Sequence, residues 1–287
     1  MIIVTGATGQ LGSRIVERLL ERVPADTVGV SVRDVAKAAG LADRGVRVRA
    51  GDFTDPGSLE RAFEGADRVL VVSAAIRESD AAVAANRAAI DAAVDAGARR
   101  VLYTSHQGSA ADSRFAPMAT HAATEEYLAA RGVPFTALRH GFYAATLGYY
   151  LGAALETGRL VLPEDGPVSW TAHDDLAEVA AAALAGTSGL DGLTPPLTAP
   201  EAVDFAAVAA LVGELTGRRI ARVVVGDEEW KSAAVEGGMP PAAADFSLGM
   251  FRAARRGEFA ATGPTLEAVL GRPAISVRSA LARMIDR

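Results

Sequence analysis

Short apolar runs alternate with longer segments of helical period through the first 140 residues of the chain. Apolar side chains occupy both faces of these runs, which is typical of parallel strands buried between two layers of helices. The runs are Ile2–Val4, Val28–Val32, Val46–Arg49, Val69–Val72, Arg100–Tyr103 and Pro134–Leu138. The helical segments between them are Gly12–Arg22, Val35–Asp43, Ser58–Phe63, Ala81–Ala96 and Ala119–Arg131. This alternation predicts repeated βαβ units and an α/β fold with a parallel sheet.

The pattern changes after residue 140. We expect a long helix at Phe142–Thr157, a short strand at Arg159–Leu162 and an Ala-rich helix at Asp174–Ala185. Gly186–Pro200 is rich in Gly, Thr and Pro and predicts a loop around a short strand. The remainder is mainly helical, apart from a strand at Ile220–Val225. Because no low-complexity linker separates the two parts, the second is expected to be a smaller lobe packed on the first.

A glycine-rich loop joins the first strand to the first helix. Gly6, Gly9 and Gly12 give it the spacing Gly-x-x-Gly-x-x-Gly. The first glycine permits a tight turn, the second lets a pyrophosphate approach the backbone, and the third lets the helix pack closely on the strand. Backbone N–H groups at the helix N-terminus then face the phosphates. The loop therefore predicts a dinucleotide site that includes Gly6, Thr8, Gly9, Gln10 and Leu11.

The residues after the second and third strands bear on which dinucleotide binds. Sites specific for NAD place an acidic residue about 20 residues after the glycines, whereas an Arg there accommodates the 2′-phosphate of NADP. Arg33 stands first past the second strand, so NADP(H) is preferred. Asp34 keeps NAD(H) possible, although it also suits the N-cap of the next helix. Asp52 and Phe53 are expected beside the adenine, where Asp52 also suits a helix cap.

Several motifs together resemble one protein family. They are GATGQLG at residues 6–12, Val32–Asp34 followed by Ala36–Ala38, Gly51–Asp55, Tyr103–Ser105, Leu138–Tyr143 and Asp174–Ala177. The chain is similar to the NmrA-like atypical short-chain dehydrogenases/reductases, and within them to the type 2 NAD(P)H:quinone oxidoreductases. The resemblance implies a Rossmann domain with a doubly wound parallel sheet and a smaller, mainly helical C-terminal substrate lobe. We expect the Rossmann domain at 1–140, with 168–186 returning to it, and the lobe at 141–167 and 187–287.

The catalytic pair of ordinary short-chain dehydrogenases is missing. Those enzymes use Tyr-x-x-x-Lys on the helix after the fifth strand, where the Lys lowers the pKa of the Tyr. Here His121 and Glu125 stand where the Tyr and Lys are expected, and Tyr127-x-x-x-Arg131 falls too late in the helix. This disfavours an ordinary alcohol or ketone reductase. A quinone fits better, because its reduction restores an aromatic ring and leaves a stabilised phenolate-like oxygen that needs little acid catalysis.

Histidine is the natural proton donor near neutral pH. His106 follows the fifth strand at the carboxyl edge, where open α/β sheets bind ligands, and His121 lies on the helix that normally carries the catalytic Tyr. These two are the catalytic candidates, and the alternative for each is a cap, an ion pair or a solvated position. His140, after the sixth strand, and His173, before Asp174, are weaker candidates with the same alternatives.

Residues near the ends of the middle strands are expected to border the nicotinamide and the substrate. The candidates for the cofactor are Ser73, Thr104, Ser105, Gly141, Phe142 and Tyr143. The candidates for the substrate are His106, Gln107, Phe142, Tyr143 and Trp170. Tyr149 and Tyr150 either extend a flat wall for an aromatic ring or pack inside the lobe.

Composition excludes several classes of function. The hydrophobic content of 50% rules out a disordered chain, and a net charge of −6 without a long basic run argues against nucleic-acid binding. The chain has no Cys, which excludes disulfides and thiolate catalysis, and no motif with metal-ligand spacing, so no metal is expected. No signal peptide is visible, and the longest uncharged apolar stretch, Gly141–Leu155, is too short to span a membrane. We expect a cytoplasmic protein that does not associate with membranes, and a homodimer is possible.

The sequence thus predicts an NAD(P)H-dependent oxidoreductase that transfers a hydride directly to a small quinone or quinone-like aromatic substrate, without flavin or metal. One alternative is a polyketide-quinone tailoring monooxygenase on the same fold, in which the reduced quinone then reacts with oxygen. A second alternative is a non-enzymatic redox sensor that binds NADP and a protein partner. The glycine loop does not distinguish these three, because a fold does not decide a function.

Overall fold

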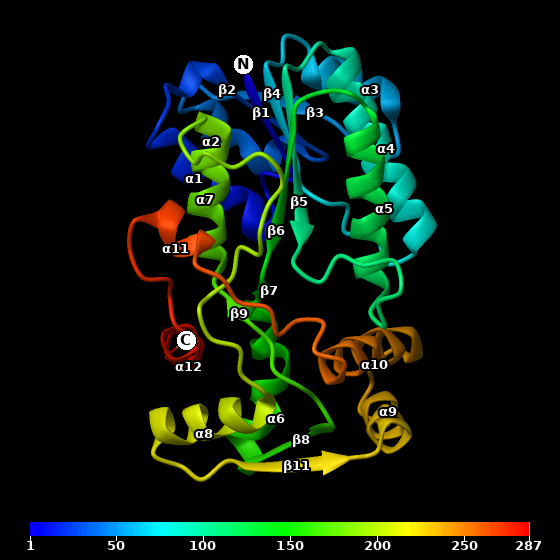
Figure 1. Ribbon diagram of the computed structural model, residues 1–287, viewed down its shortest axis with the longest axis vertical. Coiled ribbons are helices and arrows are strands. Elements are labelled where there is room, and N and C mark those ends of the chain that lie inside the picture. Colours follow the sequence, from blue (N-terminus) through cyan, green and yellow to red (C-terminus); the bar gives the residue numbers. More distant parts are fainter. Residues whose placement is uncertain (287) are drawn as a thin grey trace.

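The computed structural model describes residues 1–286, and a seven-stranded sheet lies at its centre (Figure 1). The strands are β1 (Ile2–Thr5), β2 (Val28–Val32), β3 (Arg47–Ala50), β4 (Arg68–Val71), β5 (Arg100–His106), β6 (Phe135–His140) and β10 (Gly192–Leu193). They lie in the order β10-β6-β5-β4-β1-β2-β3, and every neighbouring pair is parallel. The predicted α/β class with a doubly wound parallel sheet is confirmed.

Helices cover both faces of the sheet (Figure 1). One layer contains α1 (Gln10–Leu20), α7 (His173–Ala185) and α11 (Thr265–Leu270), and the other contains α3 (Pro56–Phe63), α4 (Ser79–Asp95) and α5 (Ala116–Ala130). In the first layer, small residues of α7 such as Ala177 and Ala180 are fully buried against the larger Ile15 and Leu19 of α1. The Ala-rich composition therefore lets α7, which is distant in sequence, pack directly beside α1.

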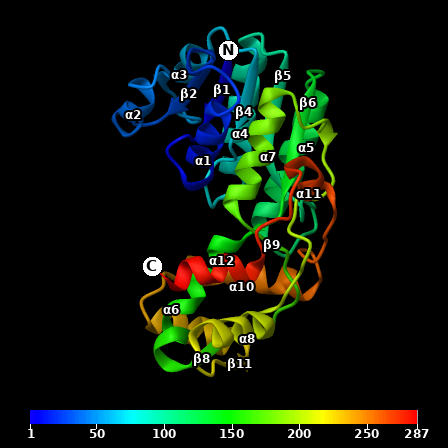
Figure 2. The ribbon, with the colours of Figure 1, turned by 90° about the vertical axis from the view of Figure 1, so that its left-hand side faces the viewer.

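A second, mainly helical part lies beyond the carboxyl end of the sheet, toward which the arrow of β5 points (Figures 1 and 2). Its elements are the 3₁₀ helix η3 (Ala144–Leu147), α6 (Gly148–Thr157), β8 (Arg159–Pro163), α8 (Phe205–Thr216), β11 (Ala221–Val225), α9 (Asp227–Glu236), α10 (Pro241–Arg255) and α12 (Val277–Ile285). β8 and β11 pair in parallel. Large apolar side chains, among them Phe205 and Phe251, form a separate core there. This lobe therefore has its own packing and faces the carboxyl edge of the sheet.

The expected long helix at Phe142–Thr157 is wrong in its first part. Phe142–Tyr143 is a short strand, β7, which pairs in parallel with β9 (Trp170–Thr171), and α6 begins only at Gly148 after η3. The reason lies at Gly141, where a Cβ would collide with the side chain of Thr171. The chain passes so close to β9 that the two residues after Gly141 pair with it instead of starting a helix.

The predicted helix at Val35–Asp43 is also wrong in type. It is a 3₁₀ helix, η2 (Val35–Ala38), followed by a single α-helical turn, α2 (Ala39–Ala42), while a short 3₁₀ turn, η1 (Ala25–Thr27), precedes β2. The side chain of Asp34 accepts a hydrogen bond from the N–H of Ala36, which caps η2 as the sequence suggested. The strands β5 and β6 are longer than predicted, because their pairing continues to His106 opposite His140.

The turn between β1 and α1 depends on two glycines. Gly6 has a φ of 61°, which favours glycine, and its carbonyl accepts the N–H of Gly9 at 2.9 Å. A Cβ at Gly12 would overlap the Gly6 carbonyl oxygen and lie 2.7 Å from its carbon. Close packing of the helix on the turn therefore requires Gly12, as its place in the motif predicts.

Replacing Gly12 by Ala is expected to lower the free energy of unfolding by about 1–3 kcal/mol, because the new methyl group would push α1 away from the turn. Urea unfolding followed by circular dichroism measures this. Gly40→Ala is the matched control, because a Cβ there meets no described atom within 4 Å. Its stability should equal or slightly exceed that of the wild type. A Gly12→Ala protein as stable as the Gly40→Ala protein would contradict the packing described here.

Candidate active site

The N-terminus of α1 presents unsatisfied backbone donors. Gly9 is its N-cap residue with extended backbone angles, and no side chain caps the helix. The N–H groups of the first turn, including those of Gln10 and Leu11, have no acceptor within the helix. Their partial positive charge faces the carboxyl edge between β1 and β4, where the strand order reverses. A pyrophosphate fits this set of donors.

The end of β2 offers positive charge beside that turn. Arg33 is exposed, and the ion pairs found within residues 1–286 leave its guanidinium without a carboxylate partner. Asp34 differs, because its carboxylate caps η2 and lies 3.9 Å from the amine of Lys37. Lys37 also lines a hollow of about 260 Å³ together with Thr8. Arg33 and Lys37 thus supply positive charge after β2, and Lys37 is a candidate that the sequence reasoning did not include.

Asp52 and Phe53 follow β3 on the same edge. The carboxylate of Asp52 accepts hydrogen bonds from the N–H and the hydroxyl of Thr54 at 2.9 and 2.8 Å. These bonds, with the charge of Arg33, lower the pKa of Asp52. The helix cap that the sequence suggested for Asp52 is wrong, because Asp55 caps α3 through the N–H of Ser58. Asp52 thus shapes the turn that carries Phe53.

Side-chain hydroxyls hold the end of β4 against its neighbours. The N–H of Ser73 donates to the hydroxyl oxygen of Thr104 at 2.9 Å, and the N–H of Val72 donates to Thr5 at 2.8 Å. The next N–H, that of Ala74, donates to the side-chain oxygen of Asn86 on α4. Ser73 and Thr104, both predicted near the cofactor, therefore lie together where the central strands end.

A buried carboxylate anchors α5 to the same strand ends. Glu125, which occupies the position expected for a catalytic Lys, receives two hydrogen bonds from the guanidinium of Arg139 at 2.9 and 2.7 Å. The hydroxyls of Ser105 and Ser109 donate to it as well, at 2.6 and 3.0 Å. Its side chain is only 5% exposed. The hydroxyl of Ser105, predicted to contact the cofactor, is thus used to satisfy Glu125.

A directed chain of hydrogen bonds fixes the protonation of His121. The amide orientation of Asn86 is set by the N–H of Ala74, which can only donate, so the side-chain nitrogen of Asn86 donates to the hydroxyl oxygen of Tyr103 at 3.3 Å. The hydroxyl proton of Tyr103 then goes to Nδ1 of His121, 2.8 Å away. Burial lowers the pKa of His121 to about 4. The neutral imidazole therefore carries its proton on Nε2.

His106 has the same tautomer for another reason. Its Nδ1 accepts the N–H of Gly108 at 3.0 Å, which leaves the proton on Nε2. The ring is 8% exposed, stacks on His121 with centroids 6.2 Å apart, and meets Phe142 and Phe259 edge-on. Burial, and then the neighbouring His121 and His140, hold the pKa of His106 well below its usual value. The two catalytic candidates are thus neighbours, and both are neutral.

His140 stands out because it is fully buried and neither ring nitrogen has a hydrogen-bond partner among residues 1–286. Its strand position is opposite His106. Burial, with the nearby His173 and His121, lowers the pKa of His140 to about 3. A buried imidazole without partners is costly, and its charged form would cost more. His140 is therefore neutral near pH 7.

The remaining predicted residues have mixed surroundings. Tyr143 is half-buried and its ring lies 4.4 Å from that of His173, while Phe142 is 8% exposed and packs between His106 and the lobe. The side-chain nitrogen of Gln107 donates to Ser169 and to the carbonyl of Phe259, which ties β5 to the lobe. Trp170 lies in the lobe core, only 1% exposed. In this structure Gln107 and Trp170 have packing roles.

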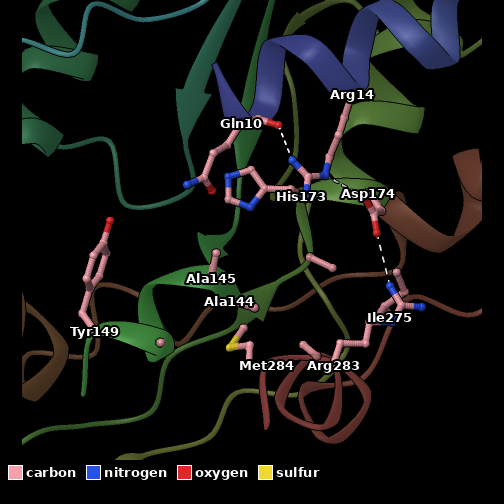
Figure 3. A pocket seen from close by; sticks show the side chains of 13 residues that line it. Gln10, Arg14, Ala144, Ala145, Tyr149, His173, Asp174, Ile275, Arg283 and Met284 are labelled. Atoms are coloured by element: carbon pink, nitrogen blue, oxygen red, sulfur yellow. Dashed lines mark hydrogen bonds and ion pairs between the residues drawn. The ribbon is translucent and has the colours of Figure 1, made fainter. Parts of the chain in front are cut away.

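An open cleft of about 400 Å³ adjoins the glycine loop (Figure 3). It lies between the sheet domain and the lobe and is lined by Gln10, Arg14, Ala144, Ala145, Gly148, Tyr149, Ala172, His173, Asp174, Ile275, Ala280, Arg283 and Met284. Of the site residues predicted from the sequence only Gln10 lines it, whereas Tyr149, one of the wall candidates, is 84% exposed at its edge. Arg14, Asp174 and Arg283 were missed, because their contacts join segments 160 and 109 residues apart.

Two features are absent from residues 1–286. No group of three or more His, Asp or Glu side chains there has the arrangement needed to hold a metal ion. No helix in the same range is long and apolar enough to cross a membrane.

Comparison with known proteins identifies the family. Residues 6–186 match the model of the NAD(P)H-binding family, so the chain belongs to that family. It is 33% identical over 276 residues to the NAD(P)H azoreductase of Xenophilus azovorans, which covers 96% of this chain and 94% of that one. It is 30% identical over 287 residues to quinone oxidoreductase 2 of Escherichia coli, which covers 100% of this chain and 99% of that one. The predicted resemblance is confirmed.

A solved structure is similar over the whole chain. The triphenylmethane reductase of Citrobacter sp., determined in complex with NADP(H), superposes with a TM-score of 0.92 at 30% identity, over 99% of this chain and 100% of that one. The family and these relatives identify the chain as an NAD(P)H-dependent oxidoreductase.

Replacing His140 by Leu tests the buried neutral imidazole. The pKa of His140 is about 3 in the folded protein, so below pH 6.5 the unfolded chain binds a proton there that the folded chain does not. The free energy of unfolding therefore falls as the pH drops from 6.5 toward 3. The variant should lose this contribution, and its stability should fall less steeply between pH 6 and 5, by up to about 1.4 kcal/mol per pH unit. Urea unfolding across pH 5–7.5 measures both slopes. Equal slopes for the two proteins would contradict a neutral His140.

Proposed function

We propose that this member of the NAD(P)H-binding family uses NADPH to reduce quinones or quinone-like conjugated aromatics by direct hydride transfer. The observation that carries the proposal is the replacement of the usual Tyr and Lys on α5 by His121 and Glu125, with Glu125 fully engaged by Arg139, Ser105 and Ser109. The site therefore holds no strong acid or activated phenol on that helix. A relative named for azo reduction and one named for quinone reduction also support a conjugated acceptor.

The residues that hold the dinucleotide follow from the donor set. The first-turn N–H groups of α1, beginning with Gln10, suit the pyrophosphate, and Arg33 with Lys37 suits the 2′-phosphate. The strand-end residues Ser73, Thr104 and Gly141–Tyr143 border the nicotinamide in this proposal. Bound NADPH supplies the hydride, and no flavin or metal is required.

The protein's own contribution to the reaction is positioning and a weak hydrogen-bond donor. His121 has its Nε2 proton fixed by Tyr103, so it offers an N–H and no lone pair on that side. Its pKa of about 4 means that it is a neutral donor at pH 7. A neutral imidazole N–H is too weak an acid to drive ketone reduction, but it can stabilise the oxygen that becomes phenolate-like when a quinone accepts a hydride. The hydride gives the hydroquinone anion, and the single proton that completes the hydroquinone comes from solvent.

Arg33 tests the cofactor assignment. Arg33→Ser should weaken NADPH binding by about 1.5–3 kcal/mol, because a charge-assisted bond to the 2′-phosphate would be lost, and NADH binding should change little. Calorimetric titration of both dinucleotides gives the two affinities. Arg219→Ser, an exposed charge in the lobe, is the control. Equal losses for NADPH and NADH would mean that Arg33 is only structural.

The acceptor and His121 are tested together. NADPH oxidation should occur with 1,4-naphthoquinone and be negligible with aliphatic ketones. His121→Ala should lower the rate by roughly 10²–10⁴ while NADPH affinity is retained. Tyr103→Phe removes only the hydroxyl that sets the tautomer, so its rate should lie between those of His121→Ala and the wild type. A His121→Ala enzyme with full activity would remove His121 from the reaction.

The same assay separates the alternatives. A reductase gives the same organic product with and without air, apart from reoxidation of the hydroquinone. A tailoring monooxygenase gives a hydroxylated or ring-altered product only in air. Tight NADPH binding without turnover on any quinone, in air or without it, would favour a redox sensor and overturn the proposal.

A further inference from the structure

One wall of the cleft carries an arginine pair that shares a single carboxylate. Nε of Arg14 on α1 lies 2.9 Å from one oxygen of Asp174, and a guanidinium nitrogen of Arg283 on α12 lies 3.2 Å from the other. All three side chains are 40–60% exposed and line the cleft. Two guanidiniums against one carboxylate leave this wall with one positive charge, and both arginines keep donors that Asp174 does not use.

No other lining residue cancels that charge. Burial, and then the Arg14 guanidinium, lowers the pKa of His173 to about 4, so this ring is neutral near pH 7. The next acidic residues along α7, Asp175 and Glu178, pair with Arg272. The remaining lining side chains described for the cleft are uncharged. An anion in the cleft therefore meets a net positive wall.

The rest of the cleft is apolar and suits a ring system. Ala144, Ala145, Ile275 and Met284 contribute aliphatic surface, and Tyr149 stands on the side opposite the arginine pair (Figure 3). Gln10 and His173 lie between the two sides, next to the glycine loop (Figure 3). A planar molecule placed across the cleft would contact Tyr149 at one end and the guanidiniums at the other. The volume of about 400 Å³ accommodates two or three fused rings.

We propose that acceptors extend from the reacting centre into this cleft, and that Arg14 and Arg283 select aromatic acceptors whose part in the cleft bears an anionic substituent, such as a sulfonate or carboxylate. The proposal rests on the proposed function, because it assigns the acceptor of that reaction. Planar guanidiniums recognise such anions through paired N–H donors, and the partly exposed setting makes the preference moderate and sensitive to salt.

Binding measured without turnover tests the selectivity. The probes are naphthalene-2-sulfonate and its uncharged isostere naphthalene-2-sulfonamide, titrated calorimetrically into the protein saturated with NADP⁺. The wild type should bind the sulfonate more tightly than the sulfonamide. The ratio of these two affinities should shrink about five- to tenfold in Arg283→Gln, since Asp174 then neutralises Arg14. Asp174→Asn should raise the ratio, because both guanidiniums become available. High salt should reduce the ratio in the wild type.

A matched control lies on the same helix. Arg278 pairs with Glu214 and does not line the cleft, so Arg278→Gln removes an equal charge from α12 and should leave the ratio unchanged. An unchanged ratio in both Arg283→Gln and Asp174→Asn would overturn the proposal. Weaker NADPH binding by Arg283→Gln and Arg14→Gln, with the ratio unchanged, would also overturn it by placing these arginines in the dinucleotide site.

Turnover then separates this proposal from the proposed function. NADPH oxidation is compared with 1,4-naphthoquinone-2-sulfonate and 1,4-naphthoquinone in the wild type and the same variants. The ratio of the two rates is compared between variants, because the difference in reduction potential between the two quinones is the same for every variant. If neither quinone is reduced, the proposed function fails, while the naphthalene probes still decide whether the cleft selects anions. Reduction of both quinones with no dependence on Arg283 or Asp174 would retain the proposed function and reject the selectivity.

Discussion

The arrangement of the site depends on one buried carboxylate. Glu125 is buried, and the cost of removing its charge from water is offset by four hydrogen bonds from Arg139, Ser105 and Ser109. Those donors come from β6, from β5 and from the loop after β5, whereas Glu125 itself is on α5. The carboxylate therefore fixes the helix to two strand ends at once. Removing one partner of such a pair typically costs about 3–5 kcal/mol, so the geometry has little freedom to drift.

The histidine chemistry follows from that anchor. One turn before Glu125 on α5, His121 is brought over the ends of β5 and β6, where it meets Tyr103 and His106. Crowding several imidazoles into a place that excludes water makes charge expensive on each of them. The resulting edge is rich in fixed N–H donors and poor in acids. Chemistry that needs a strong proton donor is disfavoured there, and chemistry that delivers a hydride to an electron-poor ring is not.

Sequence reasoning predicted the sheet and the glycine turn well, because both depend on local patterns. Buried parallel strands carry apolar residues on both faces, and a glycine such as Gly12 is required by a contact within the same turn. The helix predicted from Phe142 failed for the opposite reason. Phe142 pairs with Trp170, and no pattern within a short window of sequence reports a partner that far away. The packing of Trp170, a substrate candidate, in the lobe core likewise depends on residues distant in sequence.

The proposed acceptor cleft is the least predictable part, because three distant segments build it. Arg14 comes from α1, Asp174 from the start of α7 and Arg283 from α12, and each alone is an ordinary charged residue on a helix. Their meaning arises only when α7 packs on α1 and the last helix closes over the cleft. Under this proposal, the sheet domain can keep its dinucleotide site while changes in α6, α12 and their loops alter what is reduced. Relatives named for azo, quinone and triphenylmethane reduction are consistent with such a division, in which the edge of the sheet sets the type of reaction and the lobe sets the acceptor.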